Sequence, residues 1–336
     1  MSGKEGLPLP EGLSWMSRHR FAMKIKRVGS GLVLAYRRQN LARLRESDGG
    51  LEFIKNIAAD AVDFWGDDRS MYIMTEEELI HFDFRDQEVK WREKLSRADL
   101  AVSDGNAAFV FCRVDGVSGL FAIQRDGGGL WNRKMENVDG LFLDEKYLYV
   151  IRESEALCLE KTSGDVMWSR RLADWDLSPL ERPLEVVVCR SCMEIVLFKA
   201  KNKLFAVSRG SGEKIWEKEV AVESRAESGR EYVVAVDEKE VRVMRTGDGG
   251  VCWKKENSAK EAVEFEVFDG KLYLQEACEE NAAERCLSVY DLKSGKSEWR
   301  YESGRVSDMI MTETHFIFVS PVRGIFAVKR SKIGAH

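Results

Sequence analysis

Short stretches in which apolar and polar residues alternate run along the whole chain. Seven segments share one layout, in which an alternating strand, a polar turn and a second strand lead to an aromatic residue; they span residues 41–53, 79–91, 120–131, 156–168, 204–216, 241–253 and 287–299. Two further segments with the composition of β-strands precede such a hairpin, for example residues 140–144 and 147–151 before the hairpin at 156–168. Four short strands joined by tight turns form one antiparallel sheet. No long segment has helical periodicity, so the pattern predicts an all-β protein.

An aromatic residue recurs at a nearly fixed interval. The series is Trp15, Phe53, Trp91, Trp131, Trp168, Trp216, Trp253 and Trp299, with spacings of 38, 38, 40, 37, 48, 37 and 46 residues. A period near 40 residues is typical of a propeller, whose blades are four-stranded sheets. In six of the seven hairpins a glycine lies four residues before the aromatic, where a tight turn needs a positive φ. Gln87 replaces it in the second hairpin.

The last repeat is one strand short. Residues 307–311, 315–319 and 324–328 supply three strands, and Trp15 precedes the first hairpin. We therefore expect residues 11–18 to add the fourth strand of the last blade, which closes the ring and removes two open edges. The expected organisation is a tail at 1–10 and a single eight-bladed β-propeller at 11–336, with blades at about 16–53, 54–91, 92–131, 132–168, 169–216, 217–253, 254–299, and 300–336 plus 11–18.

The hairpins resemble the tryptophan-docking repeat of the pyrroloquinoline-quinone (PQQ) type propellers, Ala-x-Asp-x-x-Thr-Gly-x-x-x-Trp. LSVYDLKSGKSEW matches at Asp291, Gly295 and Trp299, and LFAVSRGSGEKIW matches at Gly212 and Trp216. The resemblance covers nearly the whole chain, and it implies that all eight aromatic residues dock between neighbouring blades. This superfamily includes quinone-dependent dehydrogenases and also non-enzymatic scaffolds, such as the propeller subunit of the bacterial outer-membrane β-barrel assembly machine. The fold alone therefore leaves the function open.

Composition narrows the class of protein. The 336 residues are 44% hydrophobic and 32% charged, with a net charge of −5, so a sizeable core is expected and overall charge gives no argument for nucleic acid. No stretch reaches the roughly 18 apolar residues of a membrane span, and the first 15 residues lack a signal-peptide core. Seven scattered cysteines fit reduced thiols better than a disulfide framework. We expect a cytoplasmic protein without a membrane span.

Residues suited to catalysis are sparse. Quinone-dependent relatives need a calcium site, a general-base Asp and, in many members, adjacent cysteines, and no Cys-Cys occurs here. The four histidines are far apart and lack metal-ligand spacing. Cys189 and Cys192 form a Cys-x-x-Cys on a tight turn, interpreted as two thiols flanking a hairpin, with a redox or metal role as the alternative. We expect no catalytic residue, no metal and no cofactor.

Charge is uneven along the first blades. Residues 12–45 hold nine Lys or Arg and no acid, whereas residues 46–104 hold 16 acids and 7 bases, a net charge of −9. Either this basic surface steers an acidic partner, or the charges pair across neighbouring blades. The candidate partner-binding residues of this region are Arg18, Arg20, Lys24, Lys26, Arg27, Arg37 and Arg38.

Two blades carry insertions, and loops carry function more often than strands do. The fifth blade has residues 173–184, which include Trp175, and the seventh has the acidic residues 276–285. Trp175 is an apolar side chain in a polar loop. It is either an anchor for a partner or folded back on its own blade.

These features favour a non-catalytic propeller that mediates protein–protein interactions within a larger assembly, with other protein subunits as partners. One alternative is a quinone-dependent or other small-molecule-binding enzyme that uses the central channel. Another is an RNA- or DNA-associated propeller that uses the basic first blade, which steep salt dependence of binding would support.

Overall fold

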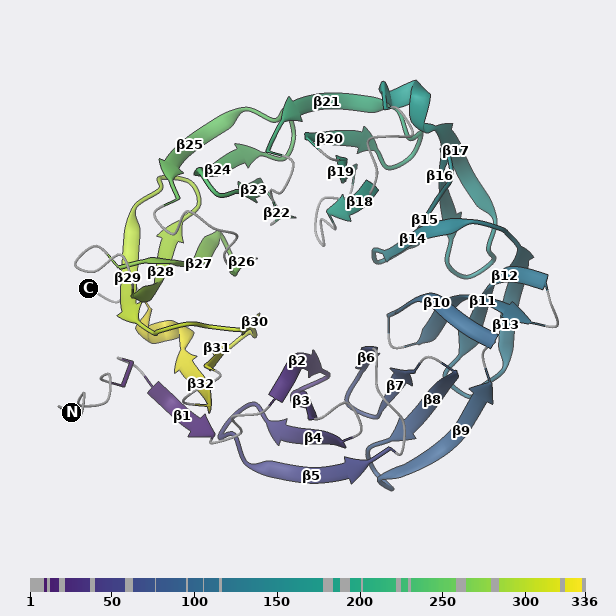
Figure 1. Cartoon of the computed structure of the whole chain (residues 1–336), viewed down its shortest axis with the longest axis horizontal. Helices are drawn as coiled ribbons and strands as arrows, with labels where there is room; N and C mark the ends of the chain where they lie inside the picture. The colour runs from purple at the N-terminus through teal and green to yellow at the C-terminus, as the bar shows by residue number, and fades with distance from the viewer. Residues whose placement is uncertain are drawn as a thin grey trace.

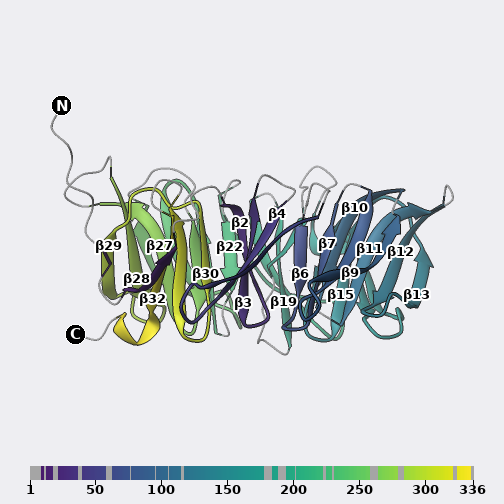
Figure 2. The ribbon, with the colours of Figure 1, turned by 90° about the horizontal axis from the view of Figure 1, so that it is seen from below.

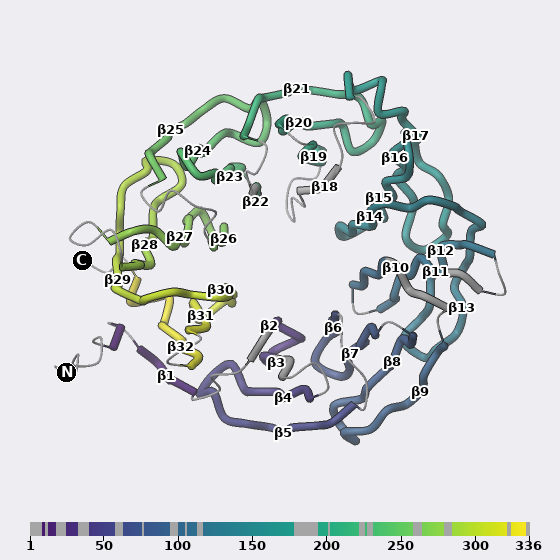
Figure 3. The backbone as a smooth tube through the Cα atoms, viewed as in Figure 1, coloured from purple at the N-terminus to yellow at the C-terminus, as the bar shows by residue number. Residues whose placement is uncertain are grey.

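Eight four-stranded antiparallel sheets are arranged around a ring (Figures 1 and 3). This computed structural model describes residues 9–10, 13–17, 22–36, 40–57, 63–75, 77–94, 96–104, 106–114, 117–177, 184–187, 194–200, 202–221, 225–228, 231–257, 264–278, 284–320 and 324–333. The expected all-β, eight-bladed propeller is confirmed. In each blade, strands a to d run from the centre of the ring to its rim.

Blades 1 to 4 are built from consecutive strands. Their bounds are β2 (Ala22–Val28), β3 (Gly31–Tyr36), β4 (Asn40–Arg45) and β5 (Leu51–Asn56); β6 (Asp63–Gly66), β7 (Ser70–Met74), β8 (Glu78–Asp83) and β9 (Glu88–Lys94); β10 (Ser96–Ser103), β11 (Ala107–Val114), β12 (Val117–Gln124) and β13 (Gly129–Lys134); β14 (Val138–Leu143), β15 (Tyr147–Arg152), β16 (Glu155–Glu160) and β17 (Val166–Arg171). A short 3-10 helix, η1 (Leu172–Trp175), follows blade 4.

Blades 5 to 7 repeat this layout, and blade 8 borrows its outer strand from the start of the chain. Their bounds are β18 (Leu184–Val187), β19 (Ile195–Ala200), β20 (Lys203–Ser208) and β21 (Lys214–Glu219); β22 (Arg225–Ser228), β23 (Tyr232–Val236), β24 (Glu240–Arg245) and β25 (Val251–Glu256); β26 (Phe265–Phe268), β27 (Lys271–Ala277), β28 (Arg285–Asp291) and β29 (Ser297–Glu302); β30 (Asp308–Met311), β31 (His315–Ser320), β32 (Gly324–Lys329) and β1 (Leu13–Ser17). A second 3-10 helix, η3 (Arg330–Lys332), follows β32.

The N-terminal strand closes the ring, as expected. β1 pairs antiparallel with β32, with Trp15 opposite Ala327 and Ser17 opposite Ile325. Trp15 is buried and shares an apolar cluster with residues of blades 8 and 1. β1 therefore completes the sheet of blade 8 and also joins blade 8 to blade 1.

Outer-strand tryptophans dock on the next blade. In six cases the indole Nε1 donates a hydrogen bond to the backbone carbonyl of the residue that directly follows strand c of that blade. The pairs are Trp15–Glu46 (2.7 Å), Trp91–Arg125 (3.2 Å), Trp131–Lys161 (2.8 Å), Trp168–Arg209 (2.8 Å), Trp216–Thr246 (2.8 Å) and Trp253–Leu292 (2.7 Å). A buried N–H group without an acceptor costs free energy of folding. Each of these bonds therefore favours one orientation of the indole side chain.

The glycine of the same turn lies against the docked ring. Gly249 has a φ of 67°, and a Cβ built there would lie 2.8 Å from Cε3 of Trp216. Gly164 is in the same situation, with a Cβ position 2.7 Å from Cδ2 of Trp131. Glycine is therefore required twice, for the left-handed backbone and for the close approach of the indole.

Blade 2 departs from this pattern in two linked ways. Its turn carries Gln87 at a φ of 54°, and the aromatic that docks there is Phe53 rather than a tryptophan. Phe84 follows strand c, and its ring centroid lies 5.9 Å from that of Phe53. The phenyl ring of Phe53 is smaller than an indole and has no N–H. It packs on a turn that carries the side chain of Gln87 in place of a glycine, and beside the second aromatic ring of Phe84.

A double-mutant cycle tests whether ring size and the turn glycine depend on each other. We expect Phe53→Trp alone to destabilise the protein by about 1–3 kcal/mol through overpacking, and Gln87→Gly added to it to recover at least about 1 kcal/mol. Urea denaturation of the four proteins measures the coupling. Additive free energies of unfolding would show that the two positions are independent.

The core consists of the interfaces between blades. Between blades 4 and 5, Trp168 packs with Trp175, Phe198 and Phe205, and Nε1 of Trp175 donates to the carbonyl of Gly212 at 2.8 Å. Trp175 is only 1% exposed. The described start of the insertion therefore folds inward as η1, and Trp175 presents no surface to a partner.

The expectation of reduced thiols is wrong for one pair, because Cys278 and Cys286 form a disulfide. They are eight residues apart, and the pairing of β27 with β28 brings their Cα atoms to 5.2 Å. Cysteine count alone did not reveal the pair, because it depends on strand register. Cys189 and Cys192 lie outside the described residues.

Removing this cross-link should cost stability. For a closed loop of this length we expect Cys278→Ser/Cys286→Ser to lower the free energy of unfolding by about 2–3 kcal/mol. Alkylation of the unreduced protein under denaturing conditions, followed by mass spectrometry, should label Cys112, Cys158 and Cys252 and leave Cys278 and Cys286 unlabelled. Seven labelled thiols, or an unchanged denaturation midpoint, would contradict the cross-link.

Candidate functional site

One side of the ring carries the turns that follow strands a and c, because neighbouring strands in each blade are antiparallel. We call this side the turn face. It is the lower edge in Figure 2, where η3 appears as the yellow helical turn beside the C-terminus. In the described part of the chain, three grooves open on it: a closure groove of about 820 Å³ between blades 8 and 1, a 1–2 groove of about 640 Å³, and a 2–4 groove of about 750 Å³ that spans blades 2 to 4.

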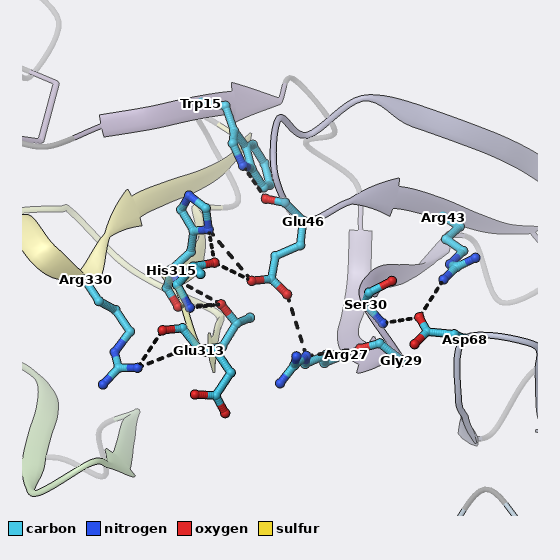
Figure 4. A network of polar contacts seen from close by, with 12 residues as sticks. Trp15, Arg27, Gly29, Ser30, Arg43, Glu46, Asp68, Glu313, His315 and Arg330 are labelled. Carbon is cyan, nitrogen blue, oxygen red and sulfur yellow. Dashed lines mark hydrogen bonds and ion pairs between the residues drawn. The ribbon is translucent and has the colours of Figure 1, made fainter.

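A hydrogen-bonded network lies beside the closure groove (Figure 4). The ring of His315 is held at both nitrogens, with Nδ1 2.8 Å from Oγ1 of Thr314 and Nε2 3.1 Å from Oγ of Ser14. The Thr314 hydroxyl donates to Oε1 of Glu46 at 2.9 Å, and Oε2 of Glu46 lies 3.6 Å from Nε of Arg27. The network therefore connects β1, blade 8 and blade 1.

The imidazole of His315 lies close to the carboxylate of Glu46. Burial lowers the pKa of His315, although the Glu46 carboxylate 3.8 Å from Nδ1 acts in the opposite direction. His315 is therefore neutral at neutral pH. Ser14, His315 and Glu46 are linked, but the hydroxyl of Thr314 stands between the imidazole and the carboxylate, so the arrangement ties elements together rather than activating Ser14.

Further ion pairs join neighbouring blades on the turn face. In each, an Asp from the a–b turn of one blade meets a basic residue that follows strand c of the next. The pairs are Asp67–Arg125, Asp104–Lys161 (2.5 Å), Asp144–Arg209 (3.3 Å) and Asp269–Arg330 (2.5 Å). Burial opposes ionisation of Asp104, but hydrogen bonds from Lys161 and from backbone N–H groups outweigh it and hold its pKa below the usual value.

The candidate basic residues that the structure describes are paired with acids of the next stretch of chain. Nζ of Lys26 lies 2.6 Å from Oδ1 of Asp63 in blade 2, and Arg27 meets Glu46. The Lys26–Asp63 pair joins neighbouring blades, whereas the Arg27–Glu46 pair lies within blade 1. Arg18, Arg20, Arg37 and Arg38 lie outside the described residues, as does the side chain of Lys24. Of these candidates, Arg27 lines the closure groove. Glu46, His315 and Arg330 line the same groove but were not predicted from the sequence, because no local motif marks them.

Within the described ranges, no group of three or more His, Cys, Asp or Glu side chains could hold a metal ion. The same part of the chain contains no helix long and apolar enough to cross a membrane.

The family model of the outer membrane protein assembly factor BamB matches residues 200–329. In structure, the chain is similar to BamB from Moraxella catarrhalis, with a TM-score of 0.65 at 12% identity over 96% of this chain and 98% of that one. The chain is therefore an eight-bladed propeller that is similar to BamB, and the family model matches about the last 130 residues before η3. A comparison with curated proteins finds no match.

Other similar structures show how widely this ring geometry is used. Sqt1 from Saccharomyces cerevisiae has a TM-score of 0.68 at 10% identity, covering 96% of this chain and 99% of that one. The computationally designed protein Ika8 has a TM-score of 0.68 at 10% identity, covering 95% and 99%. At such low identity the likeness concerns the fold, and the function has to be argued from the surface.

The closure network should make stability depend on pH. The folded pKa of His315 lies below that of an unfolded histidine, near 6.5, so the unfolded state takes up protons first as pH falls through that value. We expect wild-type stability to decline between pH 7 and 5.5, and His315→Gln to decline less, by up to about 1.4 kcal/mol per pH unit. Urea denaturation at three pH values measures both slopes, and identical slopes would refute the assignment.

Proposed function

We propose that the chain is a non-catalytic scaffold that binds a protein partner on its turn face. The observation that carries this proposal is that three grooves of 640 to 820 Å³ open on one face, each lined by residues of two or three blades. A rigid ring that presents grooves built from turns suits recognition, because turns can vary while the strands hold them in place. The likeness to BamB, an assembly factor by name, supports the same class of function.

The chemistry of the closure groove suits a polypeptide. Its lining combines both signs of charge with hydroxyl groups, among them Glu313, Lys329, Ser47 and Thr314. Glu313 and Lys329 are exposed, and neither takes part in an ion pair with another described residue. Such a mixed, partly unpaired surface matches the polar rim of protein interfaces better than a uniformly basic surface for nucleic acid would.

A charge-reversal experiment tests the turn face. Affinity purification of wild type and of Glu313→Lys/Lys329→Glu from native cells should give partners that the double variant loses by at least about tenfold. Glu77→Lys/Arg305→Glu is the matched control, because both residues are exposed and lie in connections on the opposite face. Equal loss in the control, or identical partners for all three proteins, would overturn the proposal.

The compartment is a separate prediction. The cytoplasmic location expected from the N-terminal sequence stays a prediction, and the Cys278–Cys286 disulfide favours the opposite, an oxidising compartment. The count of free thiols in protein trapped with alkylating reagent at lysis distinguishes the two.

A further inference from the structure

The junction between blades 1 and 2, where Phe53 docks, departs from the repeat at a further position. In strand c, the residue opposite the docking aromatic is alanine at three other junctions: Ala122 opposite Trp131, Ala206 opposite Trp216 and Ala327 opposite Trp15. Opposite Phe53 the same position holds Arg43. A charged side chain therefore stands where these three junctions have a methyl group.

Arg43 is a largely buried cation that borders the 1–2 groove. It is 9% exposed, and its Cζ lies 4.1 Å from the ring centroid of Phe84. Its Nη atoms lie 3.3 Å from Glu52 and 3.6 Å from Asp68 (Figure 4), longer than the roughly 2.7–2.9 Å of a charge-assisted hydrogen bond. Burial of a charge is costly, and three other junctions close with alanine. Closure of the ring therefore gives no reason for this arginine.

Two further arginines line the same groove. Arg69, in the a–b turn of blade 2, and Arg85, in its c–d turn, are both exposed. The backbone N–H of Phe84 donates to the carbonyl of Arg69 at 2.8 Å, so the two turns are adjacent. Neither arginine forms an ion pair with another described residue. The groove thus has a buried guanidinium beside two exposed ones.

The two aspartates that line the groove are already engaged. Oδ1 of Asp68 accepts the N–H of Ser30 at 2.5 Å, and Oδ1 of Asp83 accepts the N–H of Arg85 at 2.8 Å. Arg69 and Arg85 keep their side-chain donors available, and a guanidinium offers no acceptor. A group that fits here is therefore an acceptor with negative charge. Because Asp68 and Asp83 also carry charge, a singly charged group suits the groove better than a doubly charged phosphate.

We propose that the 1–2 groove binds a glutamate or aspartate side chain of the protein partner, with Arg69 and Arg85 donating to its carboxylate above Arg43. The proposal rests on the proposed function and names the chemistry of the partner. The planar fork of a guanidinium matches the two oxygens of a carboxylate. The volume of about 640 Å³ is ample for one acidic side chain together with the backbone that presents it.

The charge of Arg43 would also act on a carboxylate in the groove. Water and salt screen the attraction between exposed groups, whereas a charge that is partly buried is screened much less. Packing against Phe84 already holds the Arg43 side chain, so binding costs it little further freedom. Arg43 therefore adds attraction to the direct contacts of Arg69 and Arg85.

The test uses the whole purified protein and short peptides. The probe is the blocked tripeptide Ac-Ala-Glu-Ala-NH2, and the matched control Ac-Ala-Gln-Ala-NH2 has nearly the same shape and no charge. The Nε–H resonances of Arg69 and Arg85, each identified by its absence in Arg69→Gln or Arg85→Gln, should shift saturably with the glutamate peptide. The glutamine peptide should bind at least about tenfold more weakly, because the guanidinium groups then pair with no charge.

Variants separate this site from a general attraction by positive charge. Arg69→Gln/Arg85→Gln changes only exposed side chains and should weaken the glutamate peptide by at least about tenfold. The matched control, Lys254→Gln/Arg305→Gln, removes two exposed positive charges outside the groove and should change the affinity by less than about twofold. Relaxation of the peptide signals gives each affinity without use of the arginine resonances.

Four results would each overturn the proposal: equal binding of the glutamine peptide, unmoved resonances of Arg69 and Arg85, an equal loss in the control variant, or tighter binding of the phosphoserine peptide Ac-Ala-pSer-Ala-NH2. If the glutamate peptide fails while charge reversal at Glu313 and Lys329 still removes the partner, the proposed function stands without this inference. If the peptide binds as expected but that charge reversal changes nothing, the carboxylate site stands and the proposed function does not.

Discussion

The contact between an outer-strand tryptophan and the turn of the next blade is the interaction on which the rest of this structure depends. It combines a buried indole ring, a carbonyl that accepts the ring N–H, and a glycine whose missing side chain makes room for the ring, as for Trp216, Thr246 and Gly249. All three features recur at six of the eight blade junctions, so a local rule repeated around the chain specifies most of the ring. Trp15 makes the same contact with Glu46 from the other end of the sequence, and closure of the ring is therefore one more instance of this rule rather than a separate event.

The exception in blade 2 shows that the parts of this contact constrain one another. Among the turns that follow strand c in blades 1 to 7, the one that receives Phe53 carries a side chain, Gln87, in place of glycine, and there Phe84 packs its own ring against the docked one. A phenyl ring has no N–H to satisfy, so the carbonyl at that turn is under no demand from it. At this junction, packing between aromatic rings takes the place of the indole hydrogen bond and of the space that a glycine provides. The same rings belong to the core of blade 2.

The fold could be predicted from the sequence because the docking contact appears as a recurring pattern of residues, whereas no recurring pattern marks the candidate site. The aromatic series and the glycine four residues before it follow directly from docking geometry. By contrast, Glu46 and His315 of the closure network belong to different blades, and no spacing relates them. Charge counts pointed to the first blade, where Lys26 and Arg27, the two basic candidates whose side chains the structure describes, are paired with Asp63 and Glu46. The inward packing of Trp175 and the bonding of Cys278 to Cys286 depend likewise on tertiary contacts and on strand register.

On the turn face, residues that accept a docked tryptophan also line the grooves, but with different atoms. Glu46, Arg125 and Lys161 each give their backbone carbonyl to a docked tryptophan, and each extends its side chain to the lining of a groove. Because every residue has a carbonyl, the docking contact places no demand on which side chain stands there. The side chains can therefore differ from blade to blade, as Glu46, Phe84, Arg125 and Lys161 do, while the ring stays closed. A propeller built in this way can acquire a distinct groove at each blade junction without loosening the contact that holds it together.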